Sequence, residues 1–138
     1  MPHLTILYTP NIEAETDMSA LCRELANTML TVTDENGKQV FPTGGTRVLA
    51  WPAKHFAVAD GSREFAFVYL NVRMGKGRSP PTIQRAGEIL TAATHAHFEA
   101  LFKRRGIEGR NIGITFQVDE GHESFDAKHS NIHPLFNK

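Results

Sequence analysis

The amino-acid sequence predicts an α+β fold in which two βαβ units form a four-stranded mixed sheet with two helices on one face. Two observations support this prediction. Strand and helix patterns follow one another in the order β-α-β, β-α-β, and the strongest strand pattern is apolar on both of its faces. The chain has 138 residues, which is enough to bury a core without disulfides, so we expect residues 1–138 to form a single domain.

The first unit opens with a strand at the very N-terminus. Residues 3–9 are rich in β-forming side chains and alternate in character until Pro10-Asn11 interrupts them. Residues 13–30 then carry apolar side chains at helical spacing, and Asp17 is a candidate N-cap. These patterns predict a strand followed by a helix.

A loop and a short strand complete the first unit. Residues 31–45 contain two clusters of turn-forming residues and predict a loop, with a small hairpin across Asn36-Gly37 as one option. Residues 46–51 predict the second strand.

The second unit contains the strongest strand pattern of the chain, over residues 63–73. Its two faces carry Phe65, Phe67 and Tyr69 on one side and Ala66, Val68 and Leu70 on the other. A strand that is apolar on both faces needs a cover on both sides. Helices provide one cover, and oligomerisation is the natural source of the other.

A long helix and a last strand follow. Ser79-Pro80 is a helix start, with a capping residue before a proline in the first turn, and the helix extends to about Arg105. Its predicted buried stripe is Ile83, Ala86, Leu90, Ala93, His97 and Leu101. Residues 112–118 predict the last strand, and the apolar end of the tail over 122–138 suits docking onto the fold.

Composition excludes several classes of protein. Lys plus Arg equals Asp plus Glu at 15 each, so no bulk charge attracts nucleic acid or an anionic membrane. No apolar stretch approaches membrane-spanning length and no signal-peptide pattern is visible, so we expect a cytoplasmic protein. The single cysteine, Cys22, excludes an internal disulfide, and its helical apolar surroundings predict a buried core residue.

Pro2 is the first candidate catalytic residue. Removal of Met1 would leave a free N-terminal proline, a secondary amine. A model α-amino group has a pKa of about 7.7–8, and nearby cations or desolvation lower it. Such an amine can act as a general base or a nucleophile. The alternative is an ordinary proline at position 2, and a retained Met1 would make its nitrogen an inert amide.

Two arginines are candidate anion ligands. Arg78 ends the run Gly75-Lys76-Gly77-Arg78, which follows a strand and opens a helix, as an anion site does. The alternative is a basic turn, and the spacing fits neither a Walker loop nor a dinucleotide fingerprint. Arg47 begins the second strand after Gly44-Gly45 and either points into a cleft or is an ordinary surface arginine.

The histidines do not form a metal-binding pattern. His129 and His133 are four residues apart, but Pro134 and the polar composition argue against a helix that would hold both on one face. His95 and His97 are two residues apart and point in different directions from their helix. We therefore expect no metal.

Taken together, the motifs resemble the 5-carboxymethyl-2-hydroxymuconate isomerase family of the tautomerase superfamily, over nearly the whole chain and in order. They are Pro2-His3, Phe41-Pro42 leading to Arg47, Ala59-Asp60-Gly61 running into Phe65-Ala66-Phe67-Val68, Gly75-Lys76-Gly77-Arg78-Ser79, Ala86-Gly87-Glu88 and Asn131-Ile132-His133-Pro134-Leu135-Phe136. The most specific parts are the block from A-D-G to G-x-G-R-S and the N-x-H-x-L-F ending.

The resemblance implies a tautomerase-like β-α-β-β-α-β protomer that assembles as a homotrimer and uses no metal or cofactor. It implies conversion of 5-carboxymethyl-2-hydroxymuconate, a small polycarboxylate, to its 2-oxo isomer in aromatic (homoprotocatechuate) catabolism. In this family pattern Pro2 is the acid/base, and Arg47 and Arg78 bind substrate carboxylates and the developing enolate charge.

Two alternatives stay open. One is another tautomerase activity, such as keto–enol tautomerisation of phenylpyruvate, and the other is a trimeric binding module without catalysis. The chain also departs from the family pattern by extra residues around 31–40 and around 106–111, which predicts altered loops near the site.

Overall fold

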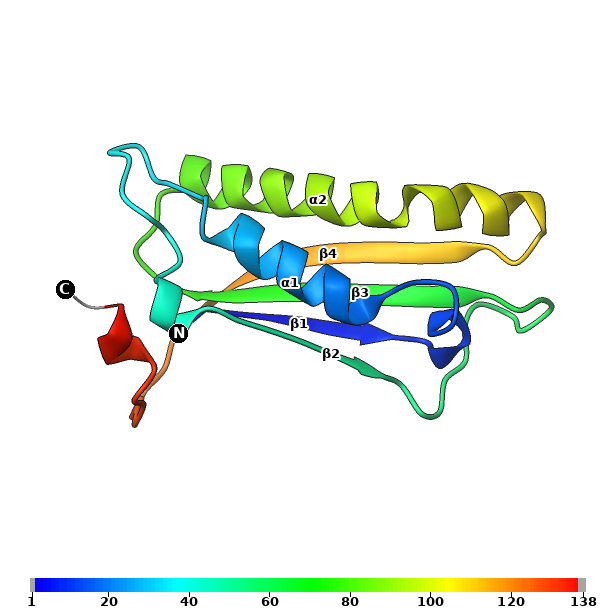
Figure 1. The fold of residues 1–138 in the computed structure, drawn as a ribbon, viewed down its shortest axis with the longest axis horizontal. Coiled ribbons are helices and arrows are strands. Elements are labelled where there is room, and N and C mark those ends of the chain that lie inside the picture. Colours follow the sequence, from blue (N-terminus) through cyan, green and yellow to red (C-terminus); the bar gives the residue numbers. More distant parts are fainter. Residues whose placement is uncertain (1, 137–138) are drawn as a thin grey trace.

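The computed structural model describes residues 2–136, which form a sheet covered on one side by two helices (Figure 1). Its strands and α-helices are, in chain order, β1 (His3–Tyr8), α1 (Met18–Met29), β2 (Arg47–Pro52), β3 (Ala66–Gly75), α2 (Pro80–Ile107) and β4 (Ile112–Gly121). The strand order across the sheet is β2-β1-β3-β4. Strands β1 and β2 are parallel, as are β3 and β4, whereas β1 and β3 are antiparallel. The predicted pair of βαβ units and the mixed sheet are confirmed.

The two faces of β3 differ in how they are covered. Ala66, Val68 and Leu70 are buried beneath the helices, together with Val72 and Met74. The alternate residues of β3 point to the other face, which no helix covers (Figure 1). The prediction from the two βαβ units that the helices cover one face of the sheet is therefore confirmed.

Helix α1 begins later than the sequence pattern suggested. The predicted start was residue 13, but residues 13–17 form a turn and the helix starts at Met18. The predicted N-cap is confirmed, because Asp17 Oδ1 accepts a hydrogen bond from the backbone N–H of Ala20 at 2.9 Å. Cys22 is half-buried against the core rather than fully inside it, and burial raises the pKa of its thiol.

The loop between α1 and β2 contains the small hairpin that Asn36-Gly37 suggested. Thr33 and Gln39 form an isolated antiparallel bridge across it. Asp34 Oδ1 accepts hydrogen bonds from the backbone N–H groups of Asn36 and Lys38 at 2.8 and 3.0 Å.

Helix α2 is capped as predicted, but its buried stripe differs from the predicted one. Ser79 Oγ accepts a hydrogen bond from the Thr82 N–H at 3.3 Å. The buried residues of the helix are Thr82, Ala86, Leu90, Thr94, Phe98, Leu101 and Arg105. Ile83 and Ala93 are only partly buried. His97 is also partly buried, with its side chain 11% exposed, and its Nε2 lies 2.8 Å from the Thr16 hydroxyl.

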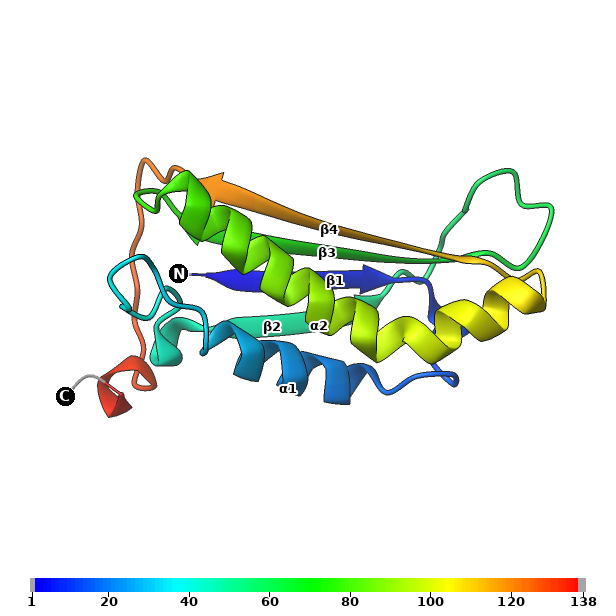
Figure 2. The same ribbon diagram turned by 90° about the horizontal axis from the view of Figure 1, so that it is seen from above.

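The buried stripe of α2 winds around the helix because consecutive buried residues are mostly four positions apart. Four residues turn about 40° beyond a full helical turn, so the buried line winds slowly around the helix. Accordingly, α2 crosses the sheet diagonally (Figure 2).

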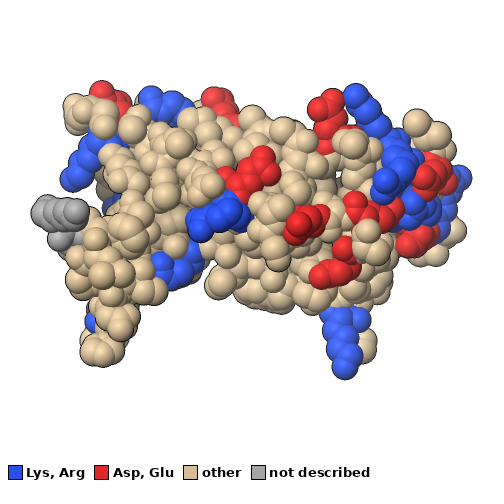
Figure 3. All heavy atoms as spheres, viewed as in Figure 1, with Lys and Arg blue, Asp and Glu red and all other residues tan. Residues whose placement is uncertain are grey.

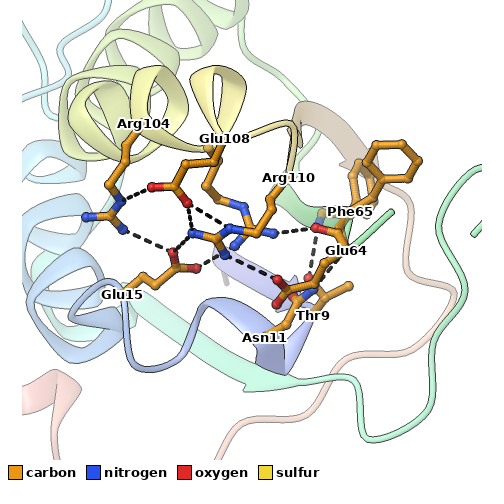
Figure 4. A network of polar contacts seen from close by, with 10 residues as sticks. Thr9, Asn11, Glu15, Glu64, Phe65, Arg104, Glu108 and Arg110 are labelled. Carbon is orange, nitrogen blue, oxygen red and sulfur yellow. Dashed lines mark hydrogen bonds and ion pairs between the residues drawn. The ribbon is translucent and has the colours of Figure 1, made fainter. Parts of the chain in front are cut away.

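The C-terminal end of α2 is fixed by a network of ion pairs (Figure 4). The side chain of Arg105 is fully buried; its Nη1 contacts Glu15 Oε2 at 2.5 Å and its Nη2 donates to the carbonyl oxygen of Glu64 at 2.7 Å. Arg104 and Arg110 bind the other oxygen of Glu15, at 3.1 and 3.0 Å. Acidic and basic side chains accordingly gather together at this end of the surface (Figure 3).

This network lies at the opposite end of the molecule from Pro2 (Figure 1). Residues 106–111 belong to that far end, where they form the last residues of α2 and its connection to β4. The prediction that these extra residues lie near the site is therefore wrong, and their loop contributes to the packing of the far end instead. Neither helix of the described chain combines the length and apolar character that a membrane span requires.

Candidate active site

Pro2 lies where several elements of the sheet meet. Strand β1 occupies an inner position; its parallel neighbour β2 starts at the same end, and its antiparallel neighbour β3 finishes there. The N-terminus of α2 follows directly from β3. Pro2 itself is buried, and it lines a cavity of about 380 Å³ that also contains Gly75, Arg78 and residues of the C-terminal tail.

Arg78 is held in place by backbone carbonyl groups. Its Nη1 donates to Gly75 O at 3.1 Å and its Nη2 donates to Val40 O at 2.9 Å. Gly77 has φ +113°, a conformation that L side chains rarely adopt, and it allows the chain to turn Arg78 back toward Gly75. The guanidinium is thereby oriented without being neutralised by these contacts.

The loop over residues 31–40 lies beside this arginine. Val40 supplies one of the two carbonyls, and the carboxylate of Glu35 accepts a hydrogen bond from the hydroxyl of Ser79. The prediction that the extra residues around 31–40 lie near the site is confirmed.

Arg47 does not line the Pro2 cavity. It lies on the uncovered face of the sheet, in a neighbouring hollow of about 800 Å³ with His3 and Arg73. The strand register explains this grouping, because His3 pairs with Arg47 on one side and with Arg73 on the other. Arg47 Nη1 donates to the carbonyl oxygens of Gly44 and Thr46 at 2.9 and 3.0 Å. The single chain thus brings Pro2 and Arg78 together in one cavity, whereas Arg47 lies in the neighbouring hollow.

The arginines at the two ends of the molecule have different partners. Arg104, Arg105 and Arg110 at the far end all pair with Glu15. Within residues 2–136, by contrast, Arg47 and Arg78 form no ion pair, and their guanidinium groups contact neutral carbonyls. Guanidinium groups that carry uncompensated charge at a cavity are what the binding of carboxylates requires.

The C-terminal tail supplies site residues that the sequence patterns did not identify. After β4 the tail returns to the Pro2 end, where its short 3₁₀ helix (His133–Leu135) packs against Thr43–Gly45 (Figure 1). The tail residues that line the Pro2 cavity are Lys128, Ser130, His133 and Pro134. The predicted docking of the tail is confirmed in part: the tail packs on the fold, but the apolar side chains of Ile132, Leu135 and Phe136, which suggested the docking, are exposed. The N-x-H-x-L-F pattern marked this segment, but only the tertiary path shows which cavity it reaches.

The tail packs very closely on the turn before β2. A Cβ placed on Gly44 would lie 2.6 Å from His133 Cα and 2.9 Å from His133 Nδ1. His133 Nδ1 is buried and has no hydrogen-bond partner among residues 2–136. Over the same residues, no group of three or more metal-ligating side chains of the His, Cys, Asp or Glu type occurs.

Comparisons with known proteins agree with these features. A family model described as 5-carboxymethyl-2-hydroxymuconate isomerase matches residues 2–136. The 5-carboxymethyl-2-hydroxymuconate Delta-isomerase of Escherichia coli is 32% identical over 136 residues, which cover 99% of each chain.

Solved structures give the same picture. A crystal structure of a 5-carboxymethyl-2-hydroxymuconate delta-isomerase is 50% identical, with a TM-score of 0.92 over 100% of this chain and 94% of that chain. A 5-carboxymethyl-2-hydroxymuconate isomerase from Deinococcus radiodurans R1 is 30% identical, with a TM-score of 0.82 over 99% and 95% of the two chains. A structure described as an "F6 fused 4-OT wild type asymmetric trimer" shares the fold, with a TM-score of 0.55 at 11% identity over 99% of each chain.

Proposed function

The chain belongs to the 5-carboxymethyl-2-hydroxymuconate isomerase family of the tautomerase superfamily, and we propose that it converts 5-carboxymethyl-2-hydroxymuconate to its 2-oxo isomer with Pro2 as the acid/base. The observation that carries this proposal is the shared cavity, in which Pro2 lies with an arginine that is oriented only by backbone carbonyls. The proposal includes a role in aromatic catabolism and a cytoplasmic location.

The proposed chemistry starts from a free proline nitrogen. Met1 lies outside the described residues, and its removal is part of the proposal. The neutral secondary amine takes the proton from the 2-hydroxyl group of the substrate, which leaves a dienolate. The amine then returns the proton to the carbon at the far end of the conjugated system, so that one O–H bond is exchanged for one C–H bond and the double bonds shift. No electrons are transferred, so we propose no cofactor.

Arg78 serves this reaction in two ways. Its positive charge in the same cavity disfavours the protonated amine and so lowers the pKa of Pro2, which suits a base that works near neutral pH. The same guanidinium stabilises the negative charge of the dienolate as it develops. Arg47 would bind a further carboxylate from the adjoining hollow.

We also propose that the active form is a homotrimer. Leu7, Leu49 and Trp51 on the uncovered face are 36%, 51% and 45% exposed, and Phe67 and Tyr69 lie beside them. An apolar sheet face of this kind calls for a partner. Arg47 lies on the same face, so assembly would place it close to a neighbouring subunit.

Ultraviolet absorbance of the dienol acid tests the proposal. Native protein should show the mass expected after loss of Met1 and should turn over this substrate faster than phenylpyruvate. Pro2→Ala, and a form that retains Met1, should lose most of the activity. Wild-type turnover by either form would exclude Pro2 as the base. A preference for phenylpyruvate would instead assign a keto–enol tautomerase, and inactivity on both substrates would assign a binding module.

A further inference from the structure

The C-terminal tail places one cation at the junction of the two hollows. Lys128 lines both the cavity of about 380 Å³ that holds Pro2 and Arg78 and the hollow of about 800 Å³ that holds Arg47. Ser130, two residues later, also lines both. Lys128 is therefore part of the wall common to both hollows, where its side chain can contact a ligand in the Pro2 cavity.

The ammonium group of Lys128 forms only a weak ion pair within the protein. Its carboxylate partner is Asp126, two residues earlier, and the side chains are 48% and 43% exposed. Exposed ion pairs of this kind contribute little to stability. A substrate carboxylate can therefore replace Asp126 at little cost. This distinguishes Lys128 from Arg105, whose fully buried guanidinium is fixed by Glu15.

We propose that Lys128 binds a second carboxylate of the substrate and thereby makes the enzyme selective for polycarboxylates. The inference rests on the proposed function, in which Arg78 receives the carboxylate and oxygen at the reacting end. The reacting end of the substrate then lies against Pro2, and its remaining carboxylates need cations farther along. Lys128 is the tail's contribution to that second position, and its flexible stem lets the ammonium group follow substrates of somewhat different shape.

Substitution of Lys128 by Met keeps the length of the side chain and removes its charge. We expect the ratio of kcat/KM for 5-carboxymethyl-2-hydroxymuconate to that for phenylpyruvate, which carries one carboxylate, to fall about tenfold, through a higher KM for the polycarboxylate. Lys128→Arg should restore most of the ratio, and Asp126→Asn should leave it equal to wild type or raise it. Lys54→Met, an exposed lysine beyond the far end of β2, is the matched control and should leave the ratio unchanged.

The outcomes separate this inference from the proposed function. If wild-type enzyme isomerises the polycarboxylate and Lys128→Met keeps the wild-type ratio, the role of Lys128 is excluded while the proposed function stands. Equal losses on both substrates would assign Lys128 to the folding of the tail and would likewise overturn the inference. If the wild-type enzyme fails on the polycarboxylate, the proposed function and this inference fall together.

Discussion

Arg78 Nη2 donates a hydrogen bond of 2.9 Å to the carbonyl oxygen of Val40, 38 residues earlier in the chain. This contact joins the start of α2 to the loop over residues 31–40, and a second bond to Gly75 O fixes the other arm of the guanidinium. The side chain is thus oriented in advance, and its charge remains available to a ligand in the Pro2 cavity.

The first prediction concerns this arginine. Arg78→Ala should lower kcat/KM for the dienol acid by about 30- to 1,000-fold, or about 2–4 kcal/mol, because the guanidinium that stabilises the developing dienolate is lost. Arg78→Lys should recover only part of the activity, because an ammonium group cannot present the planar fork that binds two carbonyls and a carboxylate together. Steady-state kinetics provide the measurement, and an unchanged kcat/KM in the Ala variant would remove Arg78 from the site.

A second prediction concerns the docking of the tail. Gly44→Ala would place a Cβ 2.6 Å from the backbone of His133, which must move because no flexible side chain can give way. We expect faster proteolysis of the segment after β4 and a lower kcat/KM, since Lys128, Ser130 and His133 leave the cavity together. Limited proteolysis with mass spectrometry, followed by kinetics, gives the two readings.

Gly87→Ala is the matched control for this experiment. Gly87 lies within α2, and a Cβ there would make an ordinary contact at 3.6 Å with Val118. The substitution should leave proteolysis unchanged and stabilise the helix by up to about 1 kcal/mol. If Gly44→Ala behaves like Gly87→Ala, the tail is not docked through this contact.

The ion-pair network at the far end gives a prediction about stability. Glu15→Gln should lower the free energy of unfolding by about 3 kcal/mol, because it leaves the buried Arg105 guanidinium without its counter-charge. Urea denaturation at neutral pH measures this change. Glu99→Gln, which breaks the exposed pair between Glu99 and Lys103, should leave the urea midpoint unchanged.

The same network predicts how stability depends on pH. Burial alone would raise the pKa of Glu15, but hydrogen bonds and charge from Arg110, Arg105 and Arg104 outweigh it and hold that pKa below its usual value of 4.5. The pair therefore contributes its full stability above about pH 4.5 and loses it as the pH falls through the lower, folded-state pKa. Urea midpoints of wild type and Glu15→Gln should converge on acidification, and a constant difference down to pH 2 would contradict the assignment.

Local patterns predicted the order of elements because each strand and helix is marked by its own alternation and caps. Asp17 and Ser79 are caps in the structure as in the prediction. The start of α1 was placed too early because Glu15, which suits a helix by composition, binds three arginines of the far end instead. Long-range packing of this kind cannot be predicted from a short window of sequence.

Only some residues of the candidate site could be predicted, for the same reason. Pro2 and Arg78 could be proposed because each stands next to an element boundary with a recognisable pattern. Lys128 and His133 could not, because their position depends on the path of the tail and on the close approach of His133 to Gly44. The separation of Arg47 from the Pro2 cavity follows from strand register, which alternation alone does not determine.

The last prediction concerns the uncovered face of the sheet. Native protein should have a mass in solution near three times the chain mass of 15.3 kDa. Trp51 is 45% exposed in the single chain, and Trp51→Glu should shift the mass toward one chain by placing a carboxylate in an apolar interface. Light scattering coupled to size exclusion measures the mass. Ile107→Glu, at an 89% exposed position near the end of α2, should remain trimeric. A monomeric wild-type protein, or a Trp51→Glu variant that keeps the trimer mass, would show that this face is not the assembly surface.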